Sequence, residues 1–454
     1  MSDTHPADPA DRARAARPPL HAVLPPLILG TATFNTQYVH DPHSMPYRDI
    51  VARALSLGVN AFDTSPYYGP SETLLGTALA ALMDPPARSE TASGLEPESV
   101  PKPVSRSSFF LITKAGRIGS DEFDYSPAWV RYSVLRSLRR LHTPHLDLVY
   151  MHDVEFVSPA EVLAAVRELR RLRDEDGVVR YVGISGFPVD VLCERAEMIY
   201  RETGEPLDAV LSYGHLTVQN RTLGLPWVAG KGEEGVQGGS EGAPLARLKR
   251  AGVDVVLNAS ILGMGLLTSR GIPVEAAETS SPLAAWHPSP PELRLACKKL
   301  AELAAAAGER LESVAIRWSL AEWARLGALA GVGVDLPDTG AGPRKVGATV
   351  CGVSSTAELE ETVAEWREVL AGLGRAEESK DEVYRTPRQE KVSSLVRNDL
   401  WPALGPWLDY AWDSPHPGWV NTRQEADRGV VPDDGIVADY DQARQTINPA
   451  PNTR

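Results

Sequence analysis

The stretch NAFDTSPYYGPSE, residues 60–72, joins a short apolar strand to a polar loop. Asp63 ends the strand, and Tyr68 follows five residues later, immediately before Gly69. A tyrosine has an unperturbed pKa of about 10. Its use as an acid or base at neutral pH therefore requires a neighbouring cation. The stretch marks a strand end at which we expect catalytic side chains.

Two further strand ends supply suitable polar groups. Lys114 closes the apolar run FFLIT, residues 109–113, and His152 follows the apolar run LVYM, residues 148–151. In a parallel barrel the carboxyl ends of the strands meet at one face, where catalytic residues gather. Lys114 and His152 are therefore expected to lie near Tyr68.

Short apolar runs alternate with helical patterns along most of the chain. Ser126-Pro127 is typical of a helix start, and Ser158 with Glu161 forms a capping box. Eight such alternations predict an α/β fold, a (β/α)8 TIM barrel with surface insertions and a C-terminal extension. A doubly wound open sheet is the main alternative. The predicted strands end near Gly30, Asp63, Lys114, Met151, Ser185, Ser212, Asn258 and Gly352.

The alternation also sets the domain boundaries. We expect a disordered segment over residues 1–22, the barrel over 23–373 and an extension over 374–454. Four tryptophans in the extension indicate that part of it packs on the barrel. They are Trp401, Trp407, Trp412 and Trp419. Two Pro- or Gly-rich stretches, Pro85–Ser107 and Gly224–Gly242, are predicted insertions, and Leu329–Arg344 is a predicted loop.

Composition narrows the class of function. The 454 residues carry 46 basic and 60 acidic side chains, a net charge of -14. Nucleic acids and anionic membranes bind clustered Lys and Arg, so this balance favours a small-molecule partner over either. The three cysteines form no Cys-x-x-Cys pair, so neither a disulfide framework nor a metal site is expected. With neither a signal peptide nor a membrane span in view, we expect a cytoplasmic protein. The sequence does not distinguish a monomer from a homodimer.

The four polar residues together resemble the catalytic tetrad of the aldo-keto reductase superfamily. The resemblance implies that Tyr68 is the general acid or base, and that Lys114 lowers the pKa of its phenol. It also implies that Asp63 pairs with Lys114 and that His152 binds the substrate oxygen. Taken singly, each of these four residues is also typical of a purely structural role. The adjacent Tyr67 competes for the assignment, but the tyrosine directly before Gly69 matches the superfamily's motif.

The same resemblance implies a bound nicotinamide cofactor. Gly30 and Thr31 would lie at its nicotinamide end, beside Asp63, and Ser185 would bind its carboxamide. An equally good interpretation is that Ser185 caps the end of its strand. The superfamily usually has Asn after this serine and Gln on the next strand, whereas this chain has Gly186 and Leu211. The implied pyrophosphate loop follows the seventh strand and includes Ser260, Leu262, Gly263 and Gly265.

The eighth strand discriminates between the two nicotinamide cofactors. NADP-preferring relatives carry Lys at the position of Gly352 and Arg at that of Glu358. Neither cation is present here. A carboxylate repels a 2'-phosphate and accepts a hydrogen bond from a free ribose hydroxyl. We therefore expect NAD, with NADP disfavoured. Alternatively, Glu358 completes a capping box with Ser355.

Three runs resemble the sugar dehydrogenases of this superfamily, the fungal D-arabinose 1-dehydrogenases and plant L-galactose dehydrogenases. The runs are residues 210–215 (VLSYGH), 264–268 (MGLLT) and 285–293 (AWHPSPPEL). The resemblance implies oxidation of an aldopyranose at C1 to a lactone. An L-fucose type of substrate is included. Candidate substrate contacts are Phe34, Tyr68, His152, Trp286 and His287. An equally good interpretation of the run Trp286-His287-Pro288 is a loop anchored on the barrel rim, with no contact to a substrate.

Two other functions stay open. An NADPH-dependent aldehyde reductase is disfavoured by Gly352 and Glu358. A nucleotide-sensing regulatory subunit is compatible with an intact tetrad, since the potassium-channel β-subunits resemble aldo-keto reductases.

Overall fold

Eight parallel strands close into a barrel in the order β1-β10-β7-β6-β5-β4-β3-β2. The structure is a computed structural model that describes residues 17–84, 103–226, 241–274, 281–336, 344–375 and 386–447. All eight predicted strands are present, ending within one residue of the predicted positions, and the barrel is confirmed. The strands are β1 (Leu27–Gly30), β2 (Ala61–Asp63), β3 (Phe110–Ala115), β4 (Leu146–His152), β5 (Val179–Gly186), β6 (Ala209–Tyr213), β7 (Val255–Ala259) and β10 (Ala348–Gly352).

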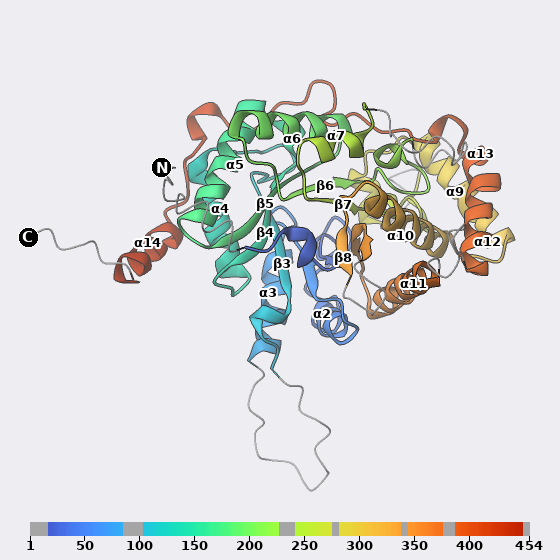
Figure 1. Cartoon of the computed structure of the whole chain (residues 1–454), viewed down its shortest axis with the longest axis horizontal. Helices are drawn as coiled ribbons and strands as arrows, with labels where there is room; N and C mark the ends of the chain where they lie inside the picture. The colour runs from blue at the N-terminus through green and yellow to red at the C-terminus, as the bar shows by residue number, and fades with distance from the viewer. Residues whose placement is uncertain are drawn as a thin grey trace, which may run out of the picture.

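Helices surround the strands (Figure 1). Ser126 caps α4 by accepting a hydrogen bond from Trp129 N, and Ser158 and Glu161 form the predicted capping box of α5. Strands covered by helices are buried on both faces and read as apolar runs. The helices of the barrel are α2 (Tyr47–Ser56), α3 (Ser71–Met83), α4 (Pro127–Arg140), α5 (Pro159–Asp174), α6 (Val189–Thr203), α7 (Pro244–Arg250), α8 (Pro282–Trp286), α9 (Pro291–Ala306), α10 (Leu311–Leu329) and α11 (Thr356–Arg375).

Strand register brings the polar strand ends to one face. Lys114 pairs with Tyr150, and His152 pairs with Ser185. Asp63 pairs with Gly30. Because all strands run in parallel, these residues lie at the carboxyl end of the barrel, as the alternation predicted.

Two segments at the opposite face differ from expectation. A hairpin of β8 (Val334–Leu336) and β9 (Arg344–Val346) begins inside the predicted loop Leu329–Arg344. Such short strands flanked by glycines give too weak a signal to be recognised. Residues 17–22 are folded and not disordered, because Leu20 is completely buried and Tyr181 Oη donates to Pro18 O at 2.7 Å.

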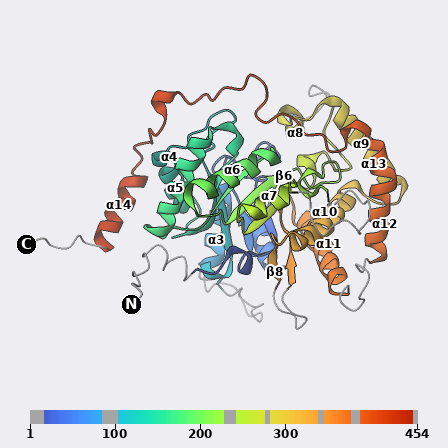
Figure 2. The same ribbon diagram turned by 45° about the horizontal axis from the view of Figure 1, so that its top comes forward.

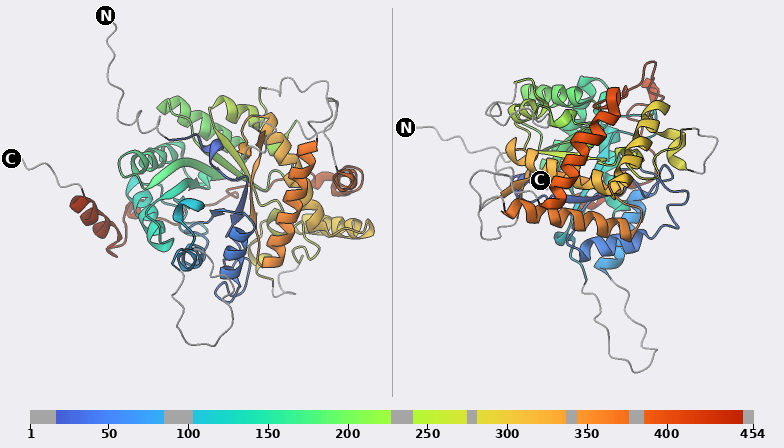
Figure 3. Two further views of the ribbon diagram at one scale, coloured as in Figure 1. Left: turned by 60° about the horizontal axis from the view of Figure 1, so that its bottom comes forward. Right: turned by 90° about the vertical axis from the view of Figure 1, so that its right-hand side faces the viewer.

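The extension packs in two parts. Its first helices are α12 (Pro387–Leu395) and α13 (Trp401–Leu404), and Trp401 meets Trp318 of α10 edge to face at 5.8 Å. Residues 408–435, here called the crossing segment, then run across the barrel to α14 (Ile436–Ile447), as Figure 2 shows. The left view of Figure 3 shows α14 on the opposite side of the barrel from α12 and α13. All four tryptophans of the extension are partly buried and lie against the core.

The crossing segment contacts the loops that follow β6, β5, β4 and β3 in turn. It therefore covers part of the carboxyl face of the barrel. Its contacts are Asp409 with Arg221, Trp412 with Phe187, Ser414 with Glu155, Trp419 with Phe156, and Arg423 with Asp124.

Most of the two predicted insertions, residues 85–102 and 227–240, lies outside the described residues. Within the described ranges, we find neither a helix that could cross a membrane nor a group of three or more potential metal ligands.

Candidate active site

An ion pair shielded from water forms the centre of the site. Lys114 Nζ donates to Asp63 Oδ1 at 2.5 Å and to Thr64 O at 3.0 Å. The two charged side chains are 3% and 5% exposed. The ammonium also lies 4.9 Å from the centroid of the Tyr68 ring. Asp63, Lys114 and Tyr68 are therefore brought together as predicted, with Lys114 held by three neighbours.

His152 completes the tetrad from the end of β4. Its ring lies 5.7 Å from the Tyr68 ring and perpendicular to it. Its Nδ1 is 3.1 Å from Ser65 Oγ, and Tyr125 Oη donates to its backbone carbonyl at 2.5 Å. Burial, then the charges of Lys114 and Arg117, hold the pKa of His152 well below its usual value. The imidazole is therefore neutral at physiological pH.

The protonated nitrogen of His152 follows from its neighbours. Asp153 Oδ2 lies 3.7 Å from His152 Nε2. A carboxylate beside a bare nitrogen lone pair is repulsive, so the proton is favoured on Nε2. The Ser65 hydroxyl then donates to Nδ1. In this tautomer Nε2–H is a donor for a substrate oxygen.

The phenol of Tyr68 differs from expectation. Burial, followed by the carboxylates of Asp63 and Asp153, raises the pKa of Tyr68 well above its usual value. Arg117 is the neighbouring cation that lowers this pKa. The charge of Lys114 is compensated by Asp63, so the expected net lowering of the phenol's pKa is absent from this structure. Tyr68 is a neutral phenol here.

The loop after β7 turns sharply through left-handed residues. Ser260, Gly263, Met264 and Gly265 have φ values of 55°, 56°, 54° and 107°. Leu262 immediately precedes the short helical turn Gly263–Gly265. Gly263 N donates to Ser260 O at 2.8 Å, and Gly265 N donates to Leu262 O at 3.1 Å. The residues of the predicted pyrophosphate loop therefore lie together, and two of their N–H groups hold the turns of the loop itself.

At the start of α11, Glu358 acts as a helix cap. Its carboxylate accepts hydrogen bonds from Ser354 N at 2.7 Å and from Ser354 Oγ at 3.0 Å. Its own N–H donates to Ser355 Oγ at 3.2 Å. Glu358 thus caps the helix, which was the alternative interpretation of this residue from the sequence. The cap holds the Glu358 carboxylate against Ser354 at the start of α11.

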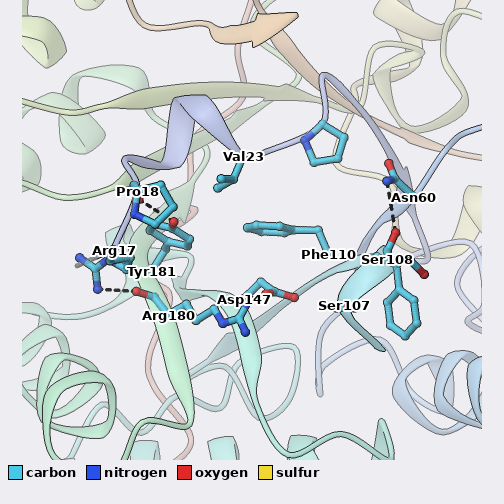
Figure 4. A pocket seen from close by; sticks show the side chains of 12 residues that line it. Arg17, Pro18, Val23, Asn60, Ser107, Ser108, Phe110, Asp147, Arg180 and Tyr181 are labelled. Atoms are coloured by element: carbon cyan, nitrogen blue, oxygen red, sulfur yellow. Dashed lines mark hydrogen bonds and ion pairs between the residues drawn. The ribbon is translucent and has the colours of Figure 1, made fainter. Parts of the chain in front are cut away.

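A cavity of about 520 Å³ lies at the other end of the barrel (Figure 4). Its wall includes Asn60, Asp147 and Arg180, which lie at the amino ends of β2, β4 and β5. The tetrad lies at the carboxyl ends. This cavity is therefore separate from the candidate active site.

Comparison with known families decides the classification. Residues 26–371 match the aldo/keto reductase family. The chain belongs to this family. Two curated relatives are D-arabinose 1-dehydrogenase from Saccharomyces cerevisiae, 38% identical over 84% of this chain and 94% of its own length, and L-galactose dehydrogenase from Arabidopsis thaliana, 31% identical over 78% and 86%.

Among solved structures, glycerol dehydrogenase from Gluconobacter oxydans aligns with a TM-score of 0.50 at 22% identity, covering 87% of this chain and 97% of that one. At this identity the likeness shows the fold alone. Family and relatives together identify this aldo/keto reductase as an oxidoreductase that acts on CH–OH groups with a nicotinamide cofactor.

Gly186 departs from the family's usual Asn for a visible reason. A Cβ on Gly186 would collide with Glu155 Oε2. Glu155 Oε1 accepts hydrogen bonds from Phe187 N and Ser414 Oγ, both at 3.0 Å. Beside it, Ser185 Oγ donates to Met151 O at 3.3 Å. A buried carboxyl group thus occupies the space of the missing amide.

Glu155 provides a test of this arrangement. Burial, then Asp153, raises the pKa of Glu155 from 4.5 to about 8. Between these values the unfolded chain loses a proton that the folded protein keeps, so stability falls as pH rises. Glu155→Gln is expected to raise the free energy of unfolding by about 1–3 kcal/mol at pH 7.5 and to change it little at pH 4.5. Urea unfolding at both pH values measures this, and a loss of stability at pH 7.5 contradicts it.

Two predicted substrate contacts pack against other residues of the chain. Phe34 is completely buried and packs near Tyr47. His287 is also buried, and both its ring nitrogens are occupied, by Ser289 Oγ at 2.8 Å and by Gly263 O at 3.1 Å. It therefore anchors the loop after β7. Apolar and aromatic residues near a strand end pack inward as readily as toward a ligand, so the sequence alone does not separate these two roles.

Trp286 remains a candidate for the pocket wall. It is half-buried, meets Tyr38 edge to face at 5.5 Å, and donates from Nε1 to Gln37 O at 2.7 Å. Trp412, which the sequence predicted only to pack somewhere on the barrel, stacks on Phe187 at 4.6 Å. Position along an irregular extension carries no periodic signal, so its location required the structure.

Gly30 and Thr31 have clear structural roles. A Cβ on Gly30 would lie 2.9 Å from Val350 Cγ1, so the barrel itself needs glycine there. Thr31 is buried, and its Oγ1 donates to Asp63 O at 3.0 Å. Thr31 thus supports the strand that carries Asp63.

Proposed function

We propose that this enzyme oxidises an aldopyranose of the D-arabinose, L-galactose or L-fucose type at C1, using NAD, and releases the aldonolactone. The observation that carries the proposal is the convergence of Tyr68, the Lys114–Asp63 pair and neutral His152 at the carboxyl end of the barrel. The two sugar dehydrogenase relatives supply the substrate class.

In this mechanism the chain handles one proton. His152 Nε2–H donates to the C1 oxygen of the sugar hemiacetal and positions it beside Tyr68. Tyr68 acts in its ionised form, after its phenolic proton has left to solvent. Its Oη then accepts the C1 hydroxyl proton while the C1–H bond breaks and C1 becomes a carbonyl carbon. A bound oxidised nicotinamide would supply the hydride acceptor and a positive charge at the site. Lys114 stabilises the phenolate of Tyr68 before this proton transfer, and Asp63 keeps Lys114 charged and in place.

The cofactor contacts are part of the same proposal. The left-handed loop after β7, which includes Ser260, Gly263 and Gly265, would lie against the pyrophosphate. Ser185 would bind the carboxamide and Glu358 would face the ribose. Leu262, Gly30, Thr31, Asp63 and Gly352 complete the set. The enzyme would act in the cytoplasm on a small-molecule sugar, as a monomer or a homodimer.

The preference for NAD yields a prediction. Gly352→Lys combined with Glu358→Arg is expected to tighten NADP binding about 10²–10⁴-fold, because each of the two new charge-assisted hydrogen bonds contributes about 1.5–3 kcal/mol. Fluorescence titration with both cofactors measures it. Glu360→Arg, which places a cation two residues along the same helix, is the matched control. Wild-type binding of NADP as tight as that of NAD would contradict the cofactor assignment.

Steady-state NADH formation on a panel of pentoses, hexoses and 6-deoxyhexoses tests the substrate class. Turnover of at least one aldose with NAD is the expected result. No activity on any sugar of the panel, together with NADPH-dependent reduction of simple aldehydes, would indicate an aldehyde reductase. Turnover too slow to measure, with a stoichiometric protein partner, would indicate a regulatory subunit.

A further inference from the structure

A second polar cluster lies beside His152 and has no part in the mechanism above. It consists of Asp153, Arg117 and Tyr67, from the loops that follow β4, β3 and β2. Arg117 Nη1 pairs with Asp153 Oδ2, and Arg117 Nη2 donates to Tyr67 Oη at 3.1 Å. The guanidinium lies over the Tyr67 ring, 3.8 Å from its centroid. The carboxylate is therefore fixed on one side by a rigid cationic neighbour.

The backbone of Asp153 is unusual. Its φ and ψ are 60° and 65°, in the left-handed region. Such conformations are costly for residues other than glycine and cluster at functional sites. The conformation places the carboxylate next to the catalytic histidine, since Oδ2 lies 3.7 Å from His152 Nε2.

One oxygen of this carboxylate is unsatisfied. Asp153 is 1% exposed, and its Oδ1 has no hydrogen-bond partner among the residues that the structure describes. An unpaired buried carboxylate oxygen is costly. The carboxylate also raises the pKa of Tyr68 and Tyr213, so it lies within electrostatic reach of the catalytic phenol. A ligand that brings an O–H donor to Oδ1 would remove the cost.

We infer that Asp153 is a specificity residue that accepts a hydrogen bond from a sugar hydroxyl next to the reacting C1 hydroxyl. The inference rests on the proposed sugar oxidation. His152 Nε2 binds the C1 oxygen, and Asp153 is adjacent to that nitrogen. Neighbouring hydroxyls of a sugar ring are one carbon–carbon bond apart, so one molecule reaches both groups. Arg117 and Tyr67 are positioning residues that hold the carboxylate. The cluster selects polyhydroxylated substrates over simple alcohols and aldehydes.

The test compares an aldose with its 2-deoxy analogue, and the 3-deoxy analogue serves as the control for loss of a more distant hydroxyl. In the wild type, loss of the hydroxyl that contacts Asp153 is expected to lower kcat/KM about 10–100-fold, the range for a hydrogen bond to a charged group. Asp153→Gly removes the carboxylate and fits the left-handed backbone. In this variant the preference for the aldose over that analogue is expected to shrink to about threefold or less. Asp153→Asn keeps the shape of the side chain and serves if the glycine variant does not fold.

The matched control is another buried aspartate, Asp147, whose Oδ2 pairs with Arg106 Nη2 at 2.7 Å at the opposite end of the barrel. Asp147→Asn is expected to keep the wild-type preference. If the Asp153 variants retain the full preference for the aldose over the 2-deoxy analogue, the inference is overturned, while wild-type turnover of aldoses still supports the proposed function. If the wild type oxidises no aldose, the proposed function itself fails.

Discussion

Tyr68→Phe is expected to lower kcat/KM for aldose oxidation by about 10²–10⁴-fold, the usual contribution of a general acid or base. The substitution removes the only atom of the side chain that exchanges a proton and leaves the ring beside Lys114 and His152 in place. Binding of the cofactor is expected to persist, because the loop after β7 does not depend on this hydroxyl. Steady-state kinetics and cofactor titration on the same preparation measure both effects.

Tyr67→Phe is the control for this prediction, because the two tyrosines are adjacent in the sequence. Tyr67 Oη accepts a hydrogen bond from Arg117, and its ring lies 5.8 Å from that of His152. Its loss should weaken positioning and cost less than the loss of Tyr68. A larger loss for Tyr67→Phe would reassign the proton transfer to Tyr67.

The pH dependence of oxidation follows from the raised pKa of Tyr68. Only the ionised phenol accepts a proton, and its fraction rises about tenfold per pH unit below the pKa. In the wild type, kcat/KM is therefore expected to rise between pH 6 and pH 9. The lowered pKa of His152 predicts no further inflection near the usual histidine value. A rate that falls with rising pH over this range would contradict Tyr68 as the base.

Lys114→Met is expected to reduce both stability and activity. The carboxylate of Asp63 is buried, and among the described residues its Oδ2 already has no partner. Breaking a buried ion pair on one side typically costs about 3–5 kcal/mol. Urea unfolding at pH 7.5 should show a loss of this size. The loss should shrink at acidic pH, because Asp63 then takes up a proton and no longer buries a charge.

The double variant Asp63→Asn with Lys114→Met separates structure from catalysis. Neutralising Asp63 removes the uncompensated charge, so the double variant should recover most of the lost stability. It should remain as inactive as Lys114→Met, because the ammonium beside the Tyr68 ring is then missing. Recovery of activity together with stability would show that Lys114 has only a structural role.

The tetrad could be predicted because each member stands at the end of a strand. The apolar runs before Asp63, Lys114 and His152 fix three positions on one barrel face, whatever the details of packing. Tyr68 follows within the same loop as Asp63. Such positions depend on strand alternation, which the sequence shows directly.

The groups around the tetrad could not be predicted in the same way. Arg117 reaches Asp153 across two loops, and Ser65 reaches His152 from a third. These contacts depend on loop conformations, including the left-handed backbone of Asp153. Gly186 was visible in the sequence as a departure from the family, but only the structure shows that Glu155 fills its space.

The ionisation state of Tyr68 also could not be predicted from the sequence. The presence of Lys114 predicted a lowered pKa for the phenol, but the charge of the lysine is balanced by Asp63 and a second carboxylate, Asp153, acts on the ring. Burial then dominates. The direction of such a shift depends on all nearby charges, and a pattern of residue types gives only some of them.

Hydride transfer from C1 of an aldose is the centre of this account, and isotope labelling measures it directly. D-arabinose and L-galactose carrying deuterium at C1 are each incubated with NAD and the wild-type enzyme, and the products are analysed by mass spectrometry. The account predicts deuterated NADH and an unlabelled lactone from at least one of the two sugars. NADH without deuterium, or a sugar product that keeps its deuterium at C1, would contradict it.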